Sequence, residues 1–284
     1  MSKLLVLGGF GQLGQCLQTV CGGDAIFLSS KEADISNESQ LEQLFHQHRP
    51  THVINCAAYT AVDKAEEEIE AATSINAIAP GKLAERCKRF DTVLIHISTD
   101  FVFEGTQTGL LAEEDTARPT GIYGKTKLAG ELAIQAAWEK HIIIRTSWLY
   151  SEYANNFAKT MLRLAEGREE LKVVADQVGT PTYALDLAKA LCEIIKKTEG
   201  KYGIYHYSNE GVASWYDFAH AIFELNGVNI RLLPIKTSEF PTKAKRPAYS
   251  VLDKTKIKKQ FNLDIPNWRD SLRTCLERLQ TRDV

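Results

Sequence analysis

The chain lacks the features that would place it in several large classes of protein. Its 284 residues carry a net charge of -2, which gives no electrostatic case for binding nucleic acid or a membrane surface. Its longest apolar runs, such as 4–7 and 142–144, are far too short to span a bilayer. Lys3 leads directly into a buried-strand pattern without a signal-peptide pattern, so we expect a cytoplasmic protein.

Cysteine is present, but never in the close pairs that bind metals or form redox motifs. This spacing predicts reduced thiols, several of them in the core. His48 and His52 have the helical spacing of two metal ligands, but Pro50 lies between them and should end the helix there. No metal site is therefore predicted. The lysine-rich run 254–259 is interpreted as a solvated helix face. The six cysteines are Cys16, Cys21, Cys56, Cys87, Cys192 and Cys275.

The first half of the chain alternates short β-rich runs with longer helical stretches. Runs such as 4–7 and 93–95 are apolar on both faces, which is typical of a parallel sheet covered by helices. With right-handed crossovers, this alternation predicts an α/β fold with a doubly wound, Rossmann-like parallel sheet. Strands are predicted at 3–7, 25–28, 52–55, 92–98 and 141–146, and helices at 11–21, 37–48, 71–89 and 121–140.

After about Trp148 the elements become shorter and more mixed. We expect residues 1–150 to form the doubly wound domain, with elements near 184–210 returning to its sheet. Residues 151–284 should form mainly a smaller α/β lobe that binds substrate. A cleft between two lobes is a common place for a substrate.

A glycine-rich run separates the first predicted strand from the first predicted helix. Gly8-Gly9-Phe10-Gly11-Gln12-Leu13-Gly14 has the form Gly-x-x-Gly-x-x-Gly. Without β-carbons the backbone can turn sharply and approach a pyrophosphate, and the helix N-terminus supplies free N–H groups. The alternative is a tight turn that binds nothing. A P-loop is excluded because no Gly-Lys-Ser/Thr follows. The run therefore predicts a dinucleotide site.

The end of the second predicted strand bears on which dinucleotide is bound. A site specific for NAD would place Asp or Glu there to bind the adenosine ribose hydroxyls. Here the strand ends in Leu28-Ser29-Ser30-Lys31, and the hydroxyls of Ser29 with the ammonium of Lys31 suit a 2′-phosphate better. NADPH is predicted as the preferred cofactor, and the nearby Glu32 leaves the use of NADH open.

Two further stretches are predicted to lie beside the dinucleotide. Asp34-Ile35 should lie at the adenine, where a carboxylate can accept from the amino group, or else form a helix-capping turn. The run 55–60 ends a strand with small residues that would let the dinucleotide lie close. The candidates on these later strands are Ala57, Ala58, Tyr59, Thr60 and Ile97.

Ile97-Ser98-Thr99-Asp100 ends a predicted central strand. Ligands of doubly wound sheets gather at the carboxyl ends of the strands. A hydroxyl there can bind a substrate carbonyl oxygen and stabilise the alkoxide that develops as hydride arrives. Thr99 is assigned this role and Ser98 a structural one. The alternative is a hydroxyl that only caps a turn.

Tyr123 and Lys127 lie one helical turn apart, so their side chains can share one face of a helix. Reduction of a carbonyl also requires a proton, and a free tyrosine, with a pKa of about 10, is a weak acid–base group at neutral pH. We expect the Lys127 ammonium to lower the pKa of Tyr123 and to bind the nicotinamide ribose. The glycine-rich run, Thr99 and this pair together predict a pyridine-nucleotide carbonyl reductase.

These elements together resemble the extended short-chain dehydrogenase/reductase family, and among its members the dTDP-4-dehydrorhamnose reductases. The resemblance covers nearly the whole chain. It rests on Ala61-Val62-Asp63-Lys64-Ala65-Glu66, on Ser98-Thr99-Asp100-Phe101-Val102-Phe103, on Tyr123-Gly124-Lys125-Thr126-Lys127-Leu128-Ala129-Gly130-Glu131, on Arg145-Thr146-Ser147-Trp148, on Asn155-Asn156-Phe157-Ala158-Lys159-Thr160-Met161-Leu162 and on Arg246-Pro247.

The resemblance implies reduction of the 4-keto group of dTDP-4-dehydro-L-rhamnose by NADPH. This is the last step of dTDP-L-rhamnose synthesis for cell-surface polysaccharide. Thr99, Tyr123 and Lys127 become the catalytic set, Asp100 and Trp148 fall where the family contacts substrate, and Arg246 is a candidate partner of the diphosphate. From the residues alone, Trp148 could instead pack between the lobes, and Arg246 could be a solvated surface residue.

Some family members are dimers bridged by Mg²⁺ through acidic side chains, one of them early in the first helix. The stretch Gly14-Gln15-Cys16-Leu17 has no carboxylate, so a bridging metal is not expected, and a monomer or a homodimer is left open. Two other functions also stay open. A sugar-nucleotide epimerase would use the same tyrosine and lysine but keep its cofactor bound, and a regulatory subunit of this fold would need none of the catalytic residues.

Overall fold

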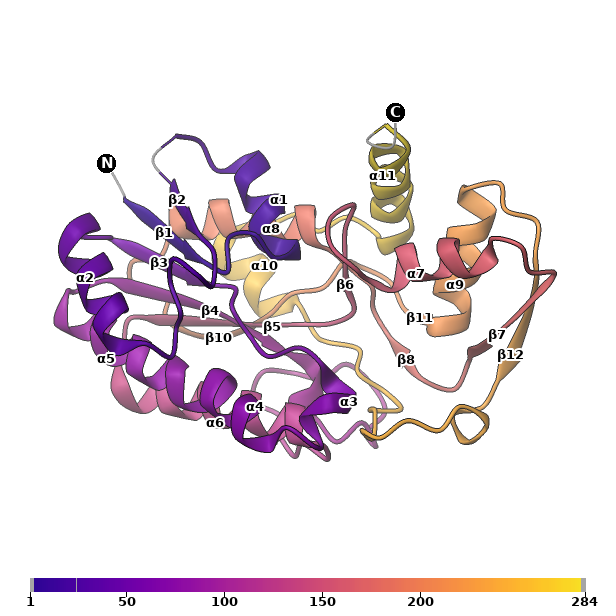
Figure 1. Ribbon diagram of the computed structural model, residues 1–284, viewed down its shortest axis with the longest axis horizontal. Coiled ribbons are helices and arrows are strands. Elements are labelled where there is room, and N and C mark those ends of the chain that lie inside the picture. The colour runs from indigo at the N-terminus through magenta and orange to yellow at the C-terminus, as the bar shows by residue number, and fades with distance from the viewer. Residues whose placement is uncertain (1–2, 24, 282–284) are drawn as a thin grey trace.

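A six-stranded parallel sheet forms the centre of the molecule, whose computed structural model describes residues 3–23 and 25–281. The strand order is β10-β5-β4-β3-β1-β2 (Figure 1). From β1 the chain adds β2 on one side and then β3, β4 and β5 on the other, as in a doubly wound fold. Every neighbouring pair is parallel. The predicted fold class is confirmed. The strands are β1 (Leu4–Leu7), β2 (Ala25–Leu28), β3 (His52–Asn55), β4 (Val93–Thr99), β5 (His141–Thr146) and β10 (Gly203–His206).

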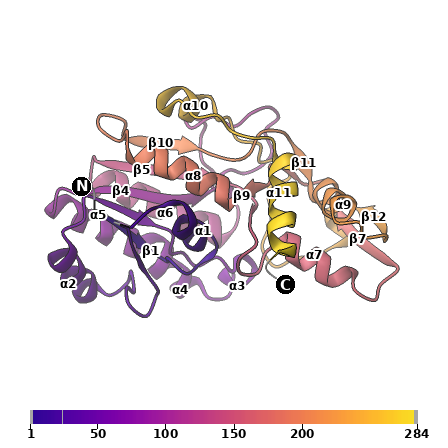
Figure 2. The same ribbon diagram turned by 90° about the horizontal axis from the view of Figure 1, so that it is seen from above.

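Helices cover both faces of this sheet because its strands are apolar on both sides. In β1, Leu4 and Val6 belong to a core on one face, and Leu5 and Leu7 to a second core on the other. The first face is covered by α1 (Gln12–Val20) and α8 (Ala184–Ile195). The second is covered by α2 (Glu38–His48), α5 (Ala79–Arg89) and α6 (Ile122–Ala137), as Figure 2 shows from above. The chain returns to the main sheet through α8 and β10.

The predicted helix over 71–89 is interrupted. It comprises α4 (Ile69–Thr73), a π-helical turn over Ser74–Ile78 and α5. Within the turn, Asn76 accepts from the Tyr59 amide at 2.9 Å and donates to its carbonyl at 3.0 Å. A π turn places one extra residue in the helix and is often found at functional sites. Here it lets Asn76 bind the loop that follows β3.

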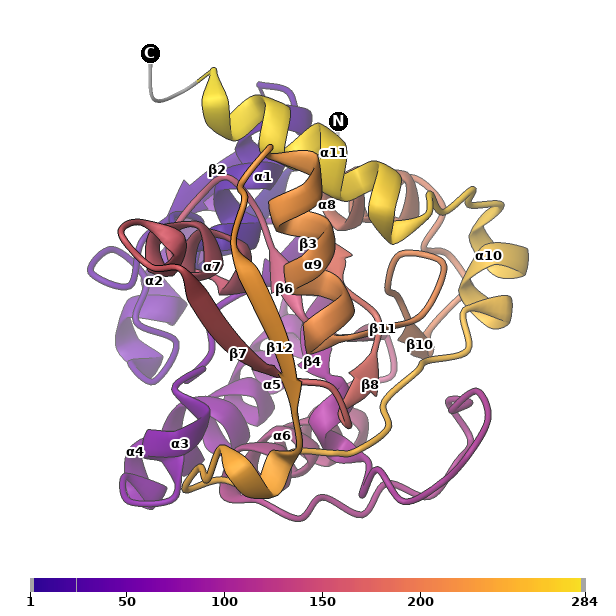
Figure 3. The same cartoon turned by 90° about the vertical axis from the view of Figure 1, so that its right-hand side faces the viewer.

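A smaller lobe lies beside the main sheet and consists of short two-stranded sheets and helices (Figure 3). Its largest ribbon pairs β7 with β12 in parallel. The aromatic side chains of Phe157 and Phe218 stack in its core, with ring centroids 5.4 Å apart. The elements are β6 (Leu149–Tyr150), α7 (Phe157–Ala165), β7 (Glu170–Val174), β8 (Val178–Gly179), β9 (Thr182–Tyr183), β11 (Ala213–Ser214), α9 (Trp215–Leu225), β12 (Arg231–Ile235) and α11 (Trp268–Gln280). Helix α10 (Thr255–Phe261), between the last two, packs instead beside β10 of the main sheet, where Phe261 contacts Tyr205.

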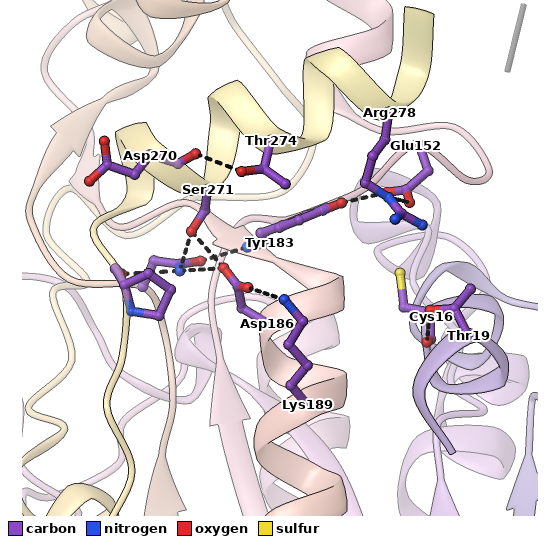
Figure 4. Close-up of polar contacts among 12 residues, drawn as sticks. Cys16, Thr19, Glu152, Tyr183, Asp186, Lys189, Asp270, Ser271, Thr274 and Arg278 are labelled. Atoms are coloured by element: carbon purple, nitrogen blue, oxygen red, sulfur yellow. Dashed lines mark hydrogen bonds and ion pairs between the residues drawn. The ribbon is translucent and has the colours of Figure 1, made fainter. Parts of the chain in front are cut away.

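The C-terminal helix α11 is bound to the rest of the molecule by buried polar contacts (Figure 4). Ser271 donates to Asp186 of α8 at 2.5 Å. One turn from its end, Arg278 donates to Glu152 at 2.7 Å, and the same fully buried carboxylate group accepts from Tyr183 at 3.0 Å. These contacts hold α11 against both α8 and the start of the lobe.

One surface prediction is wrong. Lys254, assigned to a solvated helix face, is only 6% exposed and lies 3.4 Å from Glu210. It precedes α10 and points inward because Glu210 and the Asn209 carbonyl supply acceptors there.

Within the described residues, no helix is long and apolar enough to cross a membrane.

Candidate functional site

One cavity of about 920 Å³ runs along the carboxyl ends of the main strands and reaches the lobe. We call it the main cavity. It brings together residues predicted from seven separate stretches of the chain. The predicted site residues that line it are Gly8, Phe10, Gly11, Gln12, Leu13, Gly14, Ser29, Asp34, Ile35, Ala57, Ala58, Thr60, Ile97, Thr99, Asp100, Tyr123, Lys127, Trp148 and Arg246.

The glycine-rich loop closes tightly between β1 and α1. Gly8 has a φ of +71°, and a β-carbon on Gly14 would lie 2.4 Å from the backbone carbon of Gly9. Only glycine fits such a contact, because the neighbouring atoms are main-chain atoms that cannot move aside. The loop therefore brings the N-terminus of α1 directly to the cavity, where its free N–H groups suit an anion.

Gln12 lines the cavity, but its side chain is committed elsewhere. Its amide nitrogen donates to the Leu149 carbonyl at 3.1 Å, and its oxygen accepts from Ser151 and Asn156 at 3.1 and 2.9 Å. These bonds join α1 to the start of the lobe. Any contact of Gln12 with a ligand therefore falls to its backbone.

An acid does lie at the end of β2. The Glu32 carboxylate accepts from the amide and hydroxyl of Ser29 at 2.9 and 2.6 Å. These bonds lower the pKa of Glu32. Lys31, the predicted partner of a 2′-phosphate, is not among the residues that line the main cavity. Asp34 lines the cavity and also accepts from the amide and hydroxyl of Ser36. This local turn does not cap α2, whose N-cap is Asn37.

Tyr59 is the second predicted cofactor residue that the structure does not place in the cavity lining. Its hydroxyl donates to Glu68 at 2.6 Å, and its backbone is bound by Asn76. Ala57, Ala58 and Thr60, its neighbours in the same loop, do line the cavity. The side chain of Tyr59 turns away because it has a carboxylate partner on the outer side.

At the end of β4, Thr99 and Asp100 lie side by side in the cavity wall. The Thr99 hydroxyl accepts from the Phe101 amide at 3.2 Å and donates to Asp100 at 3.1 Å. Thr99 thus caps the short helix η2 (Asp100–Val102) while still facing the cavity. Burial raises the pKa of Asp100 to about 6, opposed by hydrogen bonds with Ser250 and Thr99. In the described part of the chain, Asp100 Oδ2 is buried without a hydrogen-bond partner.

Tyr123 enters the cavity from the first turn of α6. A β-carbon on Gly124 would lie 2.2 Å from the Phe101 carbonyl oxygen, so glycine lets the helix start against η2. The phenol ring contacts Phe101 edge-on, with centroids 5.5 Å apart. Burial raises the pKa of Tyr123 to about 12, opposed by a hydrogen bond with Thr99 and reinforced by the Asp100 carboxylate. The predicted lowering of this pKa by Lys127 is therefore wrong here, because desolvation dominates.

Lys127 is only 2% exposed and points into a polar cluster under the cavity floor. Its Nζ donates to the Ile97 carbonyl at 2.7 Å and lies 3.2 Å from His96 Nε2. The other ring nitrogen of His96 lies 3.1 Å from the Asn55 amide nitrogen. Burial lowers the pKa of Lys127 to about 8, and the nearby Glu131 carboxylate opposes this. Neither His96 nor Asn55 was predicted from the sequence.

A buried ion pair lies beside β4, the strand that ends in Thr99. Arg145 of β5 binds Glu131 of α6 through Nη2 at 2.8 Å and through Nε at 3.1 and 3.2 Å to the two carboxylate oxygens. Ser98 donates to the same carboxylate at 2.5 Å, in agreement with a structural role for Ser98. The Glu131 carboxylate thus joins α6 to β5 through Arg145 and to β4 through Ser98. These bonds help to fix the position of α6, which carries Tyr123, relative to Thr99 at the end of β4.

Trp148 packs between the two parts of the molecule and also lines the main cavity. It lines the main cavity, and its indole stacks on that of Trp215 with centroids 3.6 Å apart and ring planes 8° apart. Trp148 follows β5, whereas Trp215 begins α9 in the lobe, so the stack joins the two parts. A hydrogen bond from Trp215 to Gln177 at 3.2 Å orients the second indole. Trp148 has a φ of +47°, a conformation rare in non-glycine residues.

Arg246 also lines the cavity, and its guanidinium binds Asp63 through two nitrogens at 2.7 and 3.2 Å. It is therefore held by the protein and is not a solvated surface residue.

Within the described residues, no group of three or more His, Cys, Asp or Glu side chains is placed to hold a metal ion.

Sequence reasoning missed about two-fifths of the lining. Asn155 and Asn156 lie in a stretch that carries the family resemblance, so that signal was available. Trp215 had none, because only the tertiary structure brings it to Trp148. The other missed residues are Ser30, Ala33, Cys56, Val62, Ile75, Phe101, Thr146, Ser147, Leu149 and Ala154.

Over residues 2–281 the chain matches the family described as the RmlD substrate binding domain. The chain belongs to this family. A relative from Aggregatibacter actinomycetemcomitans named dTDP-4-dehydrorhamnose reductase is 43% identical, over 96% of this chain and 98% of its own. The predicted family resemblance is confirmed.

Two solved structures of family members resemble this one closely. A dTDP-4-dehydrorhamnose reductase from Clostridium acetobutylicum has a TM-score of 0.94 and 41% identity, covering 98% of this chain and 99% of that chain. A dTDP-4-dehydrorhamnose reductase from Bacillus anthracis, in complex with NADP, has a TM-score of 0.94 and 39% identity, covering 98% and 100%. Likeness at this level extends through both the main sheet and the lobe.

Proposed function

We propose that the protein is an NADPH-dependent dTDP-4-dehydrorhamnose reductase, which makes dTDP-L-rhamnose for cell-surface polysaccharide. One observation carries the proposal. The main cavity joins the glycine-rich loop to Thr99, Asp100 and Tyr123, and continues to Trp148 and Arg246. A dinucleotide and a sugar nucleotide could therefore meet end to end beside an acid. Membership of a family whose named relatives are reductases of this substrate supports the same conclusion.

The cavity fits a dinucleotide. The β-carbon that Gly14 lacks would meet the loop backbone, so the glycines leave the N–H groups at the start of α1 open to a pyrophosphate. Ser29, Asp34, Ile35 and Lys127 all line the cavity; in this proposal the first three bind the adenosine and Lys127 binds the nicotinamide ribose. In this proposal residues 1–150 bind the cofactor and 151–284 form most of the substrate lobe. When bound, NADPH supplies the hydride.

Tyr123 supplies the proton. Because the pKa of its phenol is about 12, the group is protonated at neutral pH and can donate to the alkoxide that forms at C4. Donation leaves a phenolate, which the ammonium of Lys127, one helical turn away, stabilises. A raised pKa also makes the phenol a weaker acid than free tyrosine. Proton transfer therefore depends on the charge that develops on the substrate oxygen and on stabilisation of the phenolate by a nearby cation.

Thr99 and Asp100 orient the substrate. The Thr99 hydroxyl, next to the phenol, binds the carbonyl oxygen and stabilises its developing charge. The unpartnered oxygen of Asp100 is suited to accept from a sugar hydroxyl, since a buried acceptor without a donor is costly. Trp148 and Trp215 present an aromatic wall to the sugar nucleotide.

The experiment is to supply dTDP-4-dehydro-L-rhamnose and NADPH, follow cofactor loss and identify the sugar product. One NADPH consumed per dTDP-L-rhamnose formed is expected, whereas an epimerase would consume none. Tyr123→Phe should keep NADPH binding and lower kcat by about 10²–10⁴-fold, the usual contribution of a general acid. Tyr202→Phe, which removes a phenol hydroxyl outside the cavity lining, is the matched control. If Tyr123→Phe kept a third of wild-type activity, the assignment would fail.

Cofactor preference is tested in the same assay. The Ser29 hydroxyl that should bind a 2′-phosphate is bound by Glu32 in this structure, so a bound NADPH requires the carboxylate to turn away. We expect NADPH to be preferred and Glu32→Gln to increase the preference, because it removes a charge that repels the phosphate. A wild-type preference for NADH of tenfold or more in kcat/KM would reject this.

A further inference from the structure

Arg246 lies on a segment that runs from the lobe back to the first domain. After β12 the chain passes through η3 (Thr237–Glu239) and reaches α3 (Val62–Ala65), at the lower edge of Figure 3. Arg246 pairs there with Asp63, and Lys243 pairs with Glu67. The Ala244 amide also donates to Asp63 Oδ1 at 3.0 Å. Asp63 therefore receives both the backbone and the guanidinium of this segment.

The hydrogen bonds of Arg246 leave one edge of its guanidinium open. Nη1 donates to Asp63 Oδ1 and to the Ala244 carbonyl, each at 3.2 Å, and Nη2 donates to Asp63 Oδ2 at 2.7 Å. A guanidinium has five N–H groups in a planar fork, and these three bonds use both hydrogens of Nη1 and one of Nη2. The two remaining N–H groups, on Nε and Nη2, point from the same edge. In the described part of the chain, no acceptor binds that edge.

An open edge with two parallel N–H groups is the geometry that binds a phosphate oxygen pair or a carboxylate. Arg246 lines the main cavity, and we take the unused edge to be the one that meets a ligand there. Its side chain is 25% exposed and that of Asp63 is 42% exposed. The hydrogen bonds from Arg246 are the main cause that lowers the pKa of Asp63, so the carboxylate is ionised at neutral pH.

We propose that Asp63 is a positioning residue, which holds Arg246 so that its Nε–Nη2 edge receives the diphosphate of the substrate. This rests on the proposed function. A free arginine side chain has many rotamers, and fixing it before binding removes that entropy cost from the binding step. Asp63 adds a negative charge near the diphosphate, but both its oxygens are already occupied by N–H donors. Orientation therefore outweighs repulsion.

The test compares Asp63→Asn, Arg246→Lys and the double variant. We expect each single variant to weaken binding of dTDP about tenfold by calorimetry, since lysine keeps the charge but lacks the fork. Binding of thymidine, which has no diphosphate, and of NADPH should change less than twofold. In turnover, the KM for the sugar nucleotide should rise while kcat changes little. In the double variant, the loss should equal that of Arg246→Lys alone, because Asp63 acts only through Arg246.

Glu67→Gln is the control, since it removes the neighbouring ion pair of the same segment with Lys243. It should leave the affinity for dTDP within twofold of wild type. If Glu67→Gln weakened dTDP binding as much as Asp63→Asn does, any ion pair that attaches this segment to α3 would have the same effect, and the proposal would be overturned. Asp63→Asn that binds dTDP as well as or better than wild type would overturn it too, as would additive losses in the double variant. A wild-type protein that neither binds dTDP nor reduces the keto sugar would instead refute the proposed function.

Discussion

Removing the charge of Glu131 tests how much the buried ion pair between Glu131 and Arg145 contributes to the free energy of unfolding. The carboxylate is fully buried, and its partner Arg145 has a side chain only 4% exposed. Glu131→Gln keeps the volume of the side chain and can still accept from Ser98, but it leaves the guanidinium buried without a counter-charge. Breaking such a pair by removing one partner costs about 3–5 kcal/mol, a large part of the roughly 5–15 kcal/mol that stabilises a typical protein.

Urea unfolding, followed by tryptophan fluorescence and circular dichroism, measures this loss. At a slope of about 3 kcal/mol/M, the midpoint should fall by about 1–2 M with the slope unchanged. The double variant Glu131→Leu/Arg145→Met should recover most of the loss, because apolar residues of similar volume need no counter-charge. Glu193→Gln, which breaks an exposed pair with Lys196, should cost less than about 1 kcal/mol.

Two results would refute this reasoning. Glu131→Gln could unfold within about 1 kcal/mol of wild type, which would mean that the buried guanidinium is solvated or finds another partner. Alternatively, the double variant could be as unstable as the single one, so that the loss would come from packing. The nearest other group is His206, whose Nε2 lies 3.4 Å from Arg145 Nη1. An imidazole is neutral or positive, so His206 cannot supply the missing negative charge; burial and Arg145 lower its pKa to about 3, so it stays neutral.

Two further predictions concern the cavity itself. The carboxyl of Asp100 has a pKa raised from 3.8 to about 6, so the folded protein binds the extra proton between about pH 4 and 6. The contribution of Asp100 to the unfolding free energy should therefore fall as pH rises through that window, and Asp100→Asn should abolish this part of the pH dependence in urea titrations while lowering activity. Gly14→Ala should weaken NADPH binding by more than tenfold in fluorescence titrations, because the new methyl group meets the backbone of Gly9. Unchanged affinity would show that the loop can open without loss.

Much of the candidate site could be predicted from the sequence, because the features that form it depend on residues close together in the chain. A parallel strand buried on both faces needs a continuous apolar run, and a backbone that approaches a phosphate needs glycine. Tyr123 and Lys127 lie one turn apart on a helix, so their spacing alone puts them on one face. Strand and helix bounds in the main sheet agree with the structure to within a few residues.

Predictions that concern the surroundings of a residue depend on the tertiary structure. Lys31 and Tyr59 have suitable chemistry and lie in the predicted loops, yet neither lines the cavity. The side chain of Tyr59 turns outward because Glu68 accepts its hydroxyl. The pKa of Tyr123 is raised and not lowered, because desolvation by the surrounding chain exceeds the influence of the nearest charges. Burial depends on every element packed around a group, so spacing along the chain does not report it.

The amino-acid sequence alone determined the doubly wound fold, the tight glycine-rich loop and the candidate catalytic residues, since each depends on periodicity or on contacts between near neighbours. Only the tertiary structure decided that Asn76 binds the loop after β3, that Glu131 pairs with Arg145, that Trp215 stacks on Trp148 and that Asp63 holds Arg246. All four contacts join different helices, strands or loops, and two of them, Trp148 with Trp215 and Asp63 with Arg246, join residues far apart in the chain. Their energies depend on distance and orientation in space, which no local pattern encodes.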